Sequence, residues 1–195
     1  MFRFIAATAL SAAMIAAVSL PASAESVDAS AFSCKELTDS LNSTDKETQY
    51  GAVVILSWMA GYNATEDQGT VVDFDTLKKD GNKVVDFCAS NPNIGVMTAA
   101  AKFMGENATA VTKEAIDLAV IKCGAIANDP NPTDADAEGA GVVLMWLAGY
   151  YASAEEETMI DLDALGKSGE EIGKTCGENE NMGLVTAARK VLQIE

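Results

Sequence analysis

The feature that most constrains the fold of this chain is an internal repeat that carries its cysteines with it. Trp58, Gly61 and Tyr62 recur as Trp146, Gly149 and Tyr150, at an offset of 88 residues. The matching stretches are "VDASAFSC" (27–34) with "IDLAVIKC" (116–123), "VVDFDTL" (71–77) with "MIDLDAL" (159–165), and "NIGVMTAAAK" (93–102) with "NMGLVTAARK" (181–190). Self-similarity of this length indicates a duplicated structural unit of about 80 residues.

Each copy of the repeat holds two of the four cysteines, which predicts how they pair. Four cysteines allow three connectivities. A duplicated unit that folds by itself must close its own bridge, so the repeat predicts Cys34–Cys88 and Cys123–Cys176. A zinc site is the competing interpretation, but the chain has no Cys-x-x-Cys pair and no histidine, so disulfides are favoured.

The first 24 residues have the composition of a secretory signal peptide. Arg3 precedes an apolar stretch rich in alanine, and Ala22-Ser23-Ala24 has the small-x-small pattern of a cleavage site. A membrane anchor is the alternative, but this stretch is short and rich in Ala and Ser. We therefore expect a signal peptide over 1–24, a first domain over 25–107 and a second over 108–195, joined within the small, polar run "GENATAVTKEA".

The hydrophobic pattern predicts an all-α fold of two tandem, disulfide-stapled domains with four to five short helices each. Apolar helices are expected over 47–65 and 136–155, with Thr44 and Glu47 as a capping box for the first. The remaining helices are expected over 73–79, 81–90, 95–104, 161–167, 168–177 and 183–193. Trp58 and Trp146 are interpreted as core residues, with an exposed contact surface as the alternative.

Charge and composition argue against several classes of function. The chain has 29 acidic and 13 basic residues, for a net charge of −16, which disfavours nucleic acid and anionic membranes as partners. Without histidine no imidazole-dependent catalytic triad can form, and oxidised cysteines provide no thiolate. The repeated Asp73/Asp75 and Asp161/Asp163 pairs are explained as helix caps. We predict neither an enzyme nor a cofactor or metal site.

The Cys spacing and the order of segments resemble the HdeA/HdeB family of periplasmic acid-stress chaperones, here as a tandem duplication. The resemblance implies HdeA-like helical domains that are folded and inactive at neutral pH. In strong acid they partly unfold and bind denatured proteins, without ATP. It implies pH sensing by Asp73 and Asp161. The candidate client-binding residues are Val54, Trp58, Met59, Tyr62, Val143, Trp146, Leu147 and Tyr150.

The leading hypothesis is therefore a periplasmic chaperone whose partners are unfolded periplasmic proteins. Two modes of self-association stay open, between the repeats or as a homodimer, and no contact with membranes is expected once the signal is cleaved. The alternative is a constitutive envelope binding module with no acid-activated chaperone activity. An acid titration separates them, because only the chaperone should lose tertiary packing and expose apolar surface.

Overall fold

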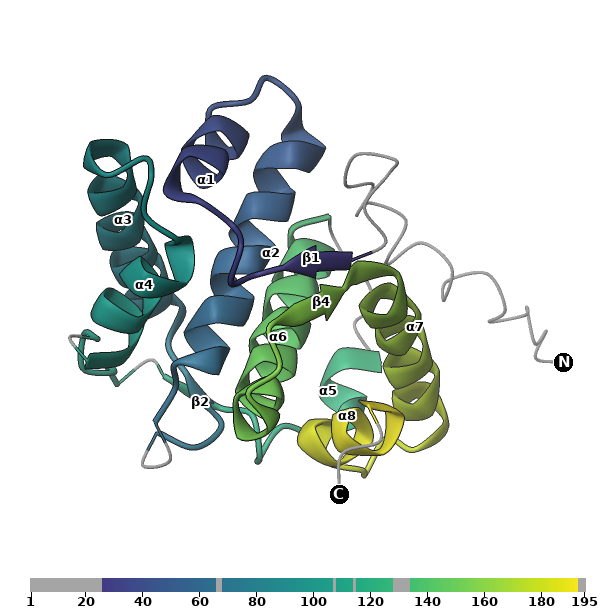
Figure 1. Cartoon of the computed structure of the whole chain (residues 1–195). Coiled ribbons are helices and arrows are strands. Elements are labelled where there is room, and N and C mark those ends of the chain that lie inside the picture. The colour runs from purple at the N-terminus through teal and green to yellow at the C-terminus, as the bar shows by residue number, and fades with distance from the viewer. Residues whose placement is uncertain (1–25, 66–67, 107, 114, 128–133, 193–195) are drawn as a thin grey trace, which may run out of the picture.

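The computed structural model describes residues 26–65, 68–106, 108–113, 115–127 and 134–192; the predicted signal peptide lies outside them. It confirms a mostly helical fold built from two units of similar architecture (Figure 1). The first unit consists of β1 (Ser26–Asp28), α1 (Cys34–Leu41), α2 (Lys46–Tyr62), β2 (Val71–Val72), α3 (Phe74–Ser90), α4 (Val96–Ala100) and the π-helical turn η1 (Ala101–Glu106). The second consists of β3 (Ile116–Asp117), α5 (Cys123–Ala127), α6 (Asp134–Ala152), the 3-10 turn η2 (Ser153–Glu155), β4 (Met159–Asp161), α7 (Leu162–Glu178) and α8 (Leu184–Leu192).

Side-chain caps fix where the first helices begin. A capping box starts α1: the Ser33 hydroxyl accepts the N–H of Glu36, and the Glu36 carboxylate accepts the N–H of Ser33 at 2.8 Å. Helix α2 begins after Asp45, whose carboxylate accepts the N–H of Thr48 at 3.1 Å. The predicted N-cap at Thr44 is therefore wrong by one residue. The Asp45 carboxylate, and not the Thr44 hydroxyl, accepts the N–H groups of Glu47 and Thr48.

Helices α3 and α7 are each continuous over 17 residues, which corrects the prediction of two short helices in each unit. A glycine inside a helix costs only about 1 kcal/mol relative to alanine. Helix α3 continues through Gly81 because Val84 and Cys88, which follow it, are buried on one face of the helix. The Asp73 side chain caps the first turn. Packing of that face therefore outweighs the local preference of glycine for a break.

The two disulfides form within the units, as the repeat predicts. Cys34–Cys88 ties α1 to α3, and Cys123–Cys176 ties α5 to α7. All four cysteines are buried. In both units the first cysteine also donates its N–H, at 2.8 Å, to a carbonyl of the repeated loop that precedes α4 or α8: Cys34 to Ile94, and Cys123 to Met182.

The two units exchange strands instead of forming separate sheets. β1 of the first unit pairs antiparallel with β4 of the second, with Val27 opposite Ile160. β2 of the first unit pairs antiparallel with β3 of the second, with Val72 opposite Ile116. Between these two ribbons, α2 packs along α6, so that the two helices lie side by side through the middle of the molecule (Figure 1). The arrangement has approximate two-fold symmetry within one chain.

Candidate functional site

The contact between α2 and α6, which we call the seam, is the closest approach of the two units. A Cβ built on Gly61 would lie 1.9 Å from the carbonyl oxygen of Trp146. A Cβ built on Gly149 would lie 1.9 Å from the carbonyl oxygen of Trp58. Only glycine permits two helix backbones to come this near. The repeated Trp-x-x-Gly pattern therefore marks the crossing point of the two helices.

The predicted client-binding residues all lie in these two packed helices. Helix α2 is buried around its whole circumference from Val54 to Gly61, because the core of its own unit covers one side and α6 the other. The predicted residues that are buried are Val54, Trp58, Met59, Trp146 and Leu147. The half-buried ones are Tyr62, Val143 and Tyr150. In this folded state they are packing residues, as the core interpretation of the two tryptophans expected.

Each tryptophan at the seam stacks on a tyrosine one helical turn later. The ring centroids of Trp58 and Tyr62 are 5.0 Å apart, and those of Trp146 and Tyr150 are 5.4 Å apart. Both pairs are close to parallel, a favourable aromatic arrangement. Because a residue and its fourth successor share one helix face, each stack places a broad apolar surface beside the glycine crossing.

Two further seam contacts were not predicted from the sequence. The buried Ser57 hydroxyl donates to the carbonyl of Val142 at 2.7 Å, across the seam. Tyr50 lies against Gly141, where an added Cβ would be 2.2 Å from its hydroxyl oxygen. Neither contact has a counterpart by repeat position, since Met145 corresponds to Ser57 and Val53 to Gly141. A search for repeated motifs misses them for that reason.

Carboxylates also join the units where the exchanged strands end. Asp28 of the first unit accepts the hydroxyl of Thr158 of the second at 3.2 Å. Asp117 of the second unit accepts the hydroxyl of Thr70 of the first at 3.0 Å. The two contacts are related by the approximate two-fold symmetry. Both acceptors are side chains that lose acceptor capacity when protonated.

The two predicted pH-sensing residues differ in their surroundings. Asp73 is buried, caps α3 by accepting the N–H groups of Asp75 and Thr76, and also accepts the N–H of Thr112 at 2.5 Å. These hydrogen bonds, that of Thr112 above all, hold the pKa of Asp73 well below its usual range. Asp161 is exposed and caps α7 through the N–H of Ala164 at 2.7 Å. The structure thus makes only one of them a buried acceptor.

Asp80 is a buried carboxylate that sequence analysis missed. It accepts the N–H of Thr109 at 2.7 Å and the Thr109 hydroxyl at 2.5 Å, and forms an ion pair with Lys83 at 2.8 Å. Its counterpart in the second unit is Ser168, so the repeat gives no signal for it. An aspartate on the buried face of an amphipathic helix was the available clue.

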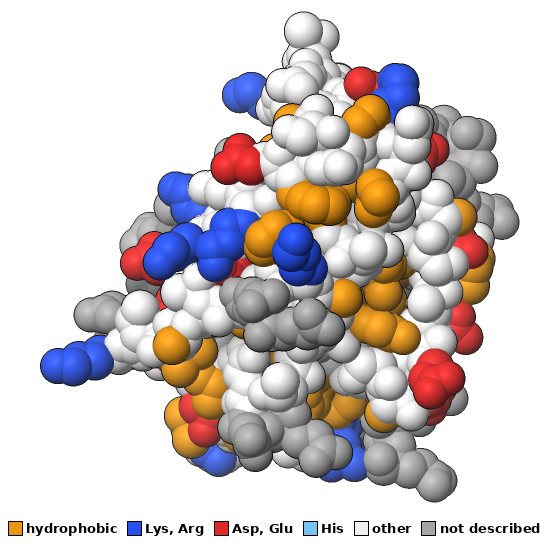
Figure 2. Space-filling view, turned by 60° about the vertical axis from the view of Figure 1, so that its left-hand side comes forward, with side chains coloured by type: hydrophobic (Ala, Val, Ile, Leu, Met, Phe, Trp, Pro, Cys, Tyr) orange, Lys and Arg blue, Asp and Glu red, His pale blue; other side chains and the backbone are white. Residues whose placement is uncertain are grey.

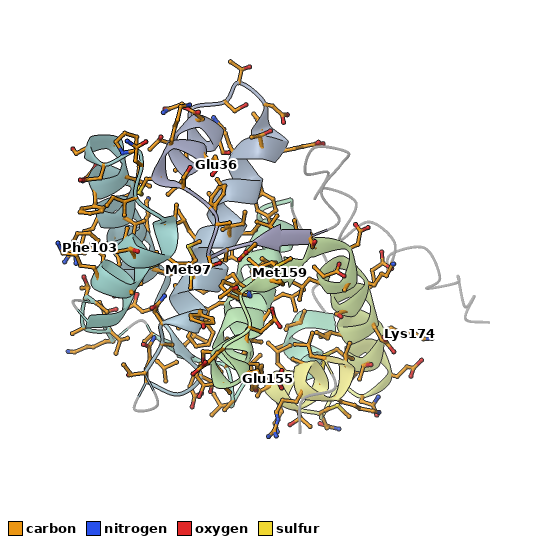
Figure 3. The ribbon with its side chains drawn as sticks, in the orientation of Figure 1. Glu36, Met97, Phe103, Glu155, Met159 and Lys174 are labelled. Carbon is orange, nitrogen blue, oxygen red and sulfur yellow. A yellow bond between two sulfur atoms is a disulfide. The ribbon has the colours of Figure 1, made fainter. Side chains whose placement is uncertain are left out.

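Hydrogen bonds also lower the pKa values of Glu36, Asp45 and Asp28. The pKa of Glu36, which lies in α1 (Figure 3), is lowered by the Ser33 hydroxyl and N–H. The pKa of Asp45 is lowered by the hydroxyl and N–H of Thr48, and that of Asp28 by Ser30. A carboxyl whose folded pKa is depressed stabilises the fold above its unfolded pKa and loses that effect as the pH falls. These groups together link folding to pH in the acid range.

Among the residues that the structure describes, no group of three or more metal-binding side chains comes together. Within that same part of the chain, no helix is long and apolar enough to cross a membrane. The geometry of the seam is that of a closed apolar interface bordered by carboxylate hydrogen bonds.

Comparison with known proteins gives the same architecture. The model of the HdeA/HdeB family matches the chain twice, over residues 4–98 and 94–186, once for each unit. No curated protein and no solved structure gives a significant match. Two stapled helical units that close on each other define a tandem member of a small, disulfide-bonded helical class. The chain belongs to the HdeA/HdeB family, a family of periplasmic chaperones.

Proposed function

We propose that this protein is an ATP-independent acid-stress chaperone of the periplasm. In strong acid it partly unfolds and binds denatured proteins through the apolar side chains that α2 and α6 bury at neutral pH. The observation that carries the proposal is the position of those side chains. The tryptophans, their stacked tyrosines and Met59 are held in a contact between two units of one chain, bordered by carboxylates that accept fewer hydrogen bonds once they are protonated.

The sign of the pH effect follows from the lowered pKa values. Glu36, Asp45 and Asp73 have folded pKa values below their ordinary ones, so each stabilises the folded state at neutral pH. That stabilisation is complete above about pH 4.5 and is lost as the pH falls through the folded values. The folded state is then weakened in strong acid, where periplasmic clients also denature. The disulfides do not titrate and limit how far each unit opens.

Net charge supports a second role for acid. Without residues 1–24 the chain loses one basic side chain, Arg3, and no acidic one, which leaves 12 basic and 29 acidic residues and a charge of −17. Full protonation of the acids changes this charge to +12. A net positive charge repels other protonated proteins and keeps complexes with clients dispersed. The methionines of α2 and α6, once uncovered in acid, suit varied clients because their side chains are flexible and polarizable.

The surface of the folded state agrees with an inactive form at neutral pH. On the face shown in Figure 2, hydrophobic side chains appear in small separate groups between charged and polar ones. Of the apolar side chains labelled in Figure 3, Met159 of β4 is exposed, whereas Met97 and Phe103 are half-buried. Single exposed apolar side chains of this kind are normal for a folded protein. Client binding would then require the seam to open.

The test is suppression of aggregation. An acid-labile client is brought to pH 2–3 with and without the purified protein, and light scattering is recorded before and after neutralisation. We expect lower scattering with the protein, and a Gly61→Ala variant with a weakened seam should protect at a higher pH than the wild type. Gly173→Ala, at a helical site with open space, is the matched control. Absence of protection at several-fold molar excess would contradict the proposal.

The rival function, a constitutive envelope binding module, makes the opposite spectroscopic prediction. It requires near-UV circular dichroism to persist at pH 2–3 and hydrophobic-dye binding to stay low. The chaperone proposal requires the near-UV signal to fall and dye binding to rise over that range.

We also propose that residues 1–24 are removed on export, and that the domains span 25–107 and 108–195. Mass spectrometry of the exported protein would test the cleavage site by showing whether Glu25 is the first residue. Sedimentation at neutral pH would test whether the folded chain also forms a homodimer.

A further inference from the structure

The linker between the units is bound to the first unit by two buried carboxylates. Residues 108–112, which we call the strap, run along α3. Asp80 accepts both the N–H and the hydroxyl of Thr109, and Asp73 accepts the N–H of Thr112. Each end of the strap is therefore held by a carboxylate. Asp73 is 4% exposed and Asp80 is 3% exposed, so water competes poorly for these bonds.

The strap covers apolar side chains from both units. Ala108 and Val111 form one wall of a small cavity. Its other walls include Ala60 of α2, Met104 of η1 and Trp146 of α6, so that the cavity lies at the border of the seam. Met104 and Trp146 are buried in the folded state. Movement of the strap away from α3 would open this border without breaking either disulfide.

Among the residues that the structure describes, the second unit shows no equivalent of this attachment. At the positions that correspond to Asp73 and Asp80 it has Asp161 and Ser168. Asp161 is exposed, and its described hydrogen bond is to Ala164 at the start of α7. In the described part of the chain, the pair of buried carboxylates is therefore found in the first unit and not in the second.

The charged groups around the two carboxylates are few. Lys83 of α3 contacts both Asp80 and the Thr109 hydroxyl, at 2.8 and 2.9 Å. Asp75 lies in the first turn of α3, and Lys113 follows the strap. In the described part of the chain, α2, η1 and α6 line this region with uncharged side chains. Attachment therefore depends mainly on hydrogen bonds from the strap to ionised oxygens.

We infer that the strap is a clamp released by acid: the carboxylates of Asp73 and Asp80 hold it across the border of the seam, and in acid the strap detaches and uncovers Met104 and Trp146. A protonated carboxyl carries a hydrogen on one oxygen and cannot accept all the bonds that the carboxylate accepts. The inference rests on the proposed function only in assuming that the uncovered side chains bind clients. Detachment itself is tested without any client.

The experiment measures amide hydrogen exchange of Thr109 and Thr112 by NMR between pH 7 and pH 2, corrected for intrinsic rates. We expect both amides to be protected at pH 7, and to lose protection at a higher pH than the amide of Val84 in the core of α3. In Asp80→Asn the Thr109 amide should exchange roughly tenfold to a hundredfold faster at pH 7, the range expected for loss of a hydrogen bond to a charged group. Asp161→Asn, which alters the corresponding cap of the second unit, is the matched control and should leave both amides unchanged.

A second variant keeps the inference testable if Asp80→Asn does not fold. Thr109→Val removes the Thr109 hydroxyl at a site outside the helices. It should also speed hydrogen exchange of the amide of residue 109. The inference is overturned if the strap amides lose protection only together with Val84, or if Thr109→Val and Asp80→Asn both exchange like the wild type. Aggregation assays report on the chaperone proposal separately, so either proposal can fail while the other stands.

Discussion

The glycine crossing at the seam makes a sharp prediction, because the same substitution should have opposite effects at two helical sites. At Gly173 of α7 an added Cβ meets nothing within 4 Å. Gly173→Ala should therefore gain only the helix propensity of alanine, about 1 kcal/mol. At Gly61 the added Cβ would lie 1.9 Å from one backbone atom and 2.9 Å from another, whereas real Cβ contacts stay above 3.0 Å.

The cost at Gly61 can be estimated from that overlap. The obstacle is the backbone of α6, so the helices must shift until the distance from the new Cβ to the Trp146 carbonyl oxygen has grown by about 1 Å. Overpacking in a well-packed interior costs about 1–3 kcal/mol, and a backbone obstacle belongs at the upper end. After the propensity gain of about 1 kcal/mol, Gly61→Ala should be about 2 kcal/mol less stable than the wild type. The two variants should then differ by about 3 kcal/mol.

Urea unfolding at pH 7, followed by far-UV circular dichroism and tryptophan fluorescence, measures this difference. Both tryptophans lie at the seam, so fluorescence reports its opening directly. The double variant Gly61→Ala/Gly149→Ala should lose less than the sum of the single variants, because one separation of the helices relieves both overlaps. If Gly61→Ala proves as stable as Gly173→Ala, the close crossing of α2 and α6 is refuted.

Three further predictions concern the acids, the bridges and the seam. Asp73→Asn should unfold at lower urea than the wild type at pH 7, with the gap narrowing below about pH 3.8, where Asp73 binds a proton in the unfolded chain before it does so in the folded one; a gap that stays constant down to pH 2.5 would contradict the assigned pKa direction. Replacing Cys123 and Cys176 by serine should cost about 4 kcal/mol, the loop-closure value for a separation of 53 residues, measured by the same unfolding assay. Ser57→Ala should cost about 1 kcal/mol, since it removes a buried hydrogen bond across the seam; a fully stable variant would show that the bond contributes nothing.

The sequence predicts the parts of this fold that depend on repetition. Duplicated cysteines determine the pairing, and the apolar stretches locate the two central helices within a few residues. Strand exchange was not predictable, because β2 and β3 have only two residues each and their partners are distant in the chain. The continuity of α3 through Gly81 was also missed, since local propensity cannot weigh the packing of Val84 and Cys88.

The candidate site divides in the same way. Trp58, Trp146 and their stacked tyrosines recur in both units, so the sequence finds them. Asp80 and Ser57 have no identical residue at the corresponding position of the second repeat. The role of each depends on a partner that the fold brings near, which is Thr109 for Asp80 and the carbonyl of Val142 for Ser57. A comparison of the two repeats cannot detect residues that act in one repeat and are replaced in the other.

Placing both sides of the seam in one polypeptide changes the order of its closing reaction. Two separate subunits that come apart must meet again by diffusion, and their reassociation slows with dilution. Here the linker keeps α2 and α6 within reach, so reclosure of the seam within one chain is first order and its rate does not depend on protein concentration. Under the proposed function, recovery after neutralisation should therefore proceed at the same rate in a scarce protein as in an abundant one.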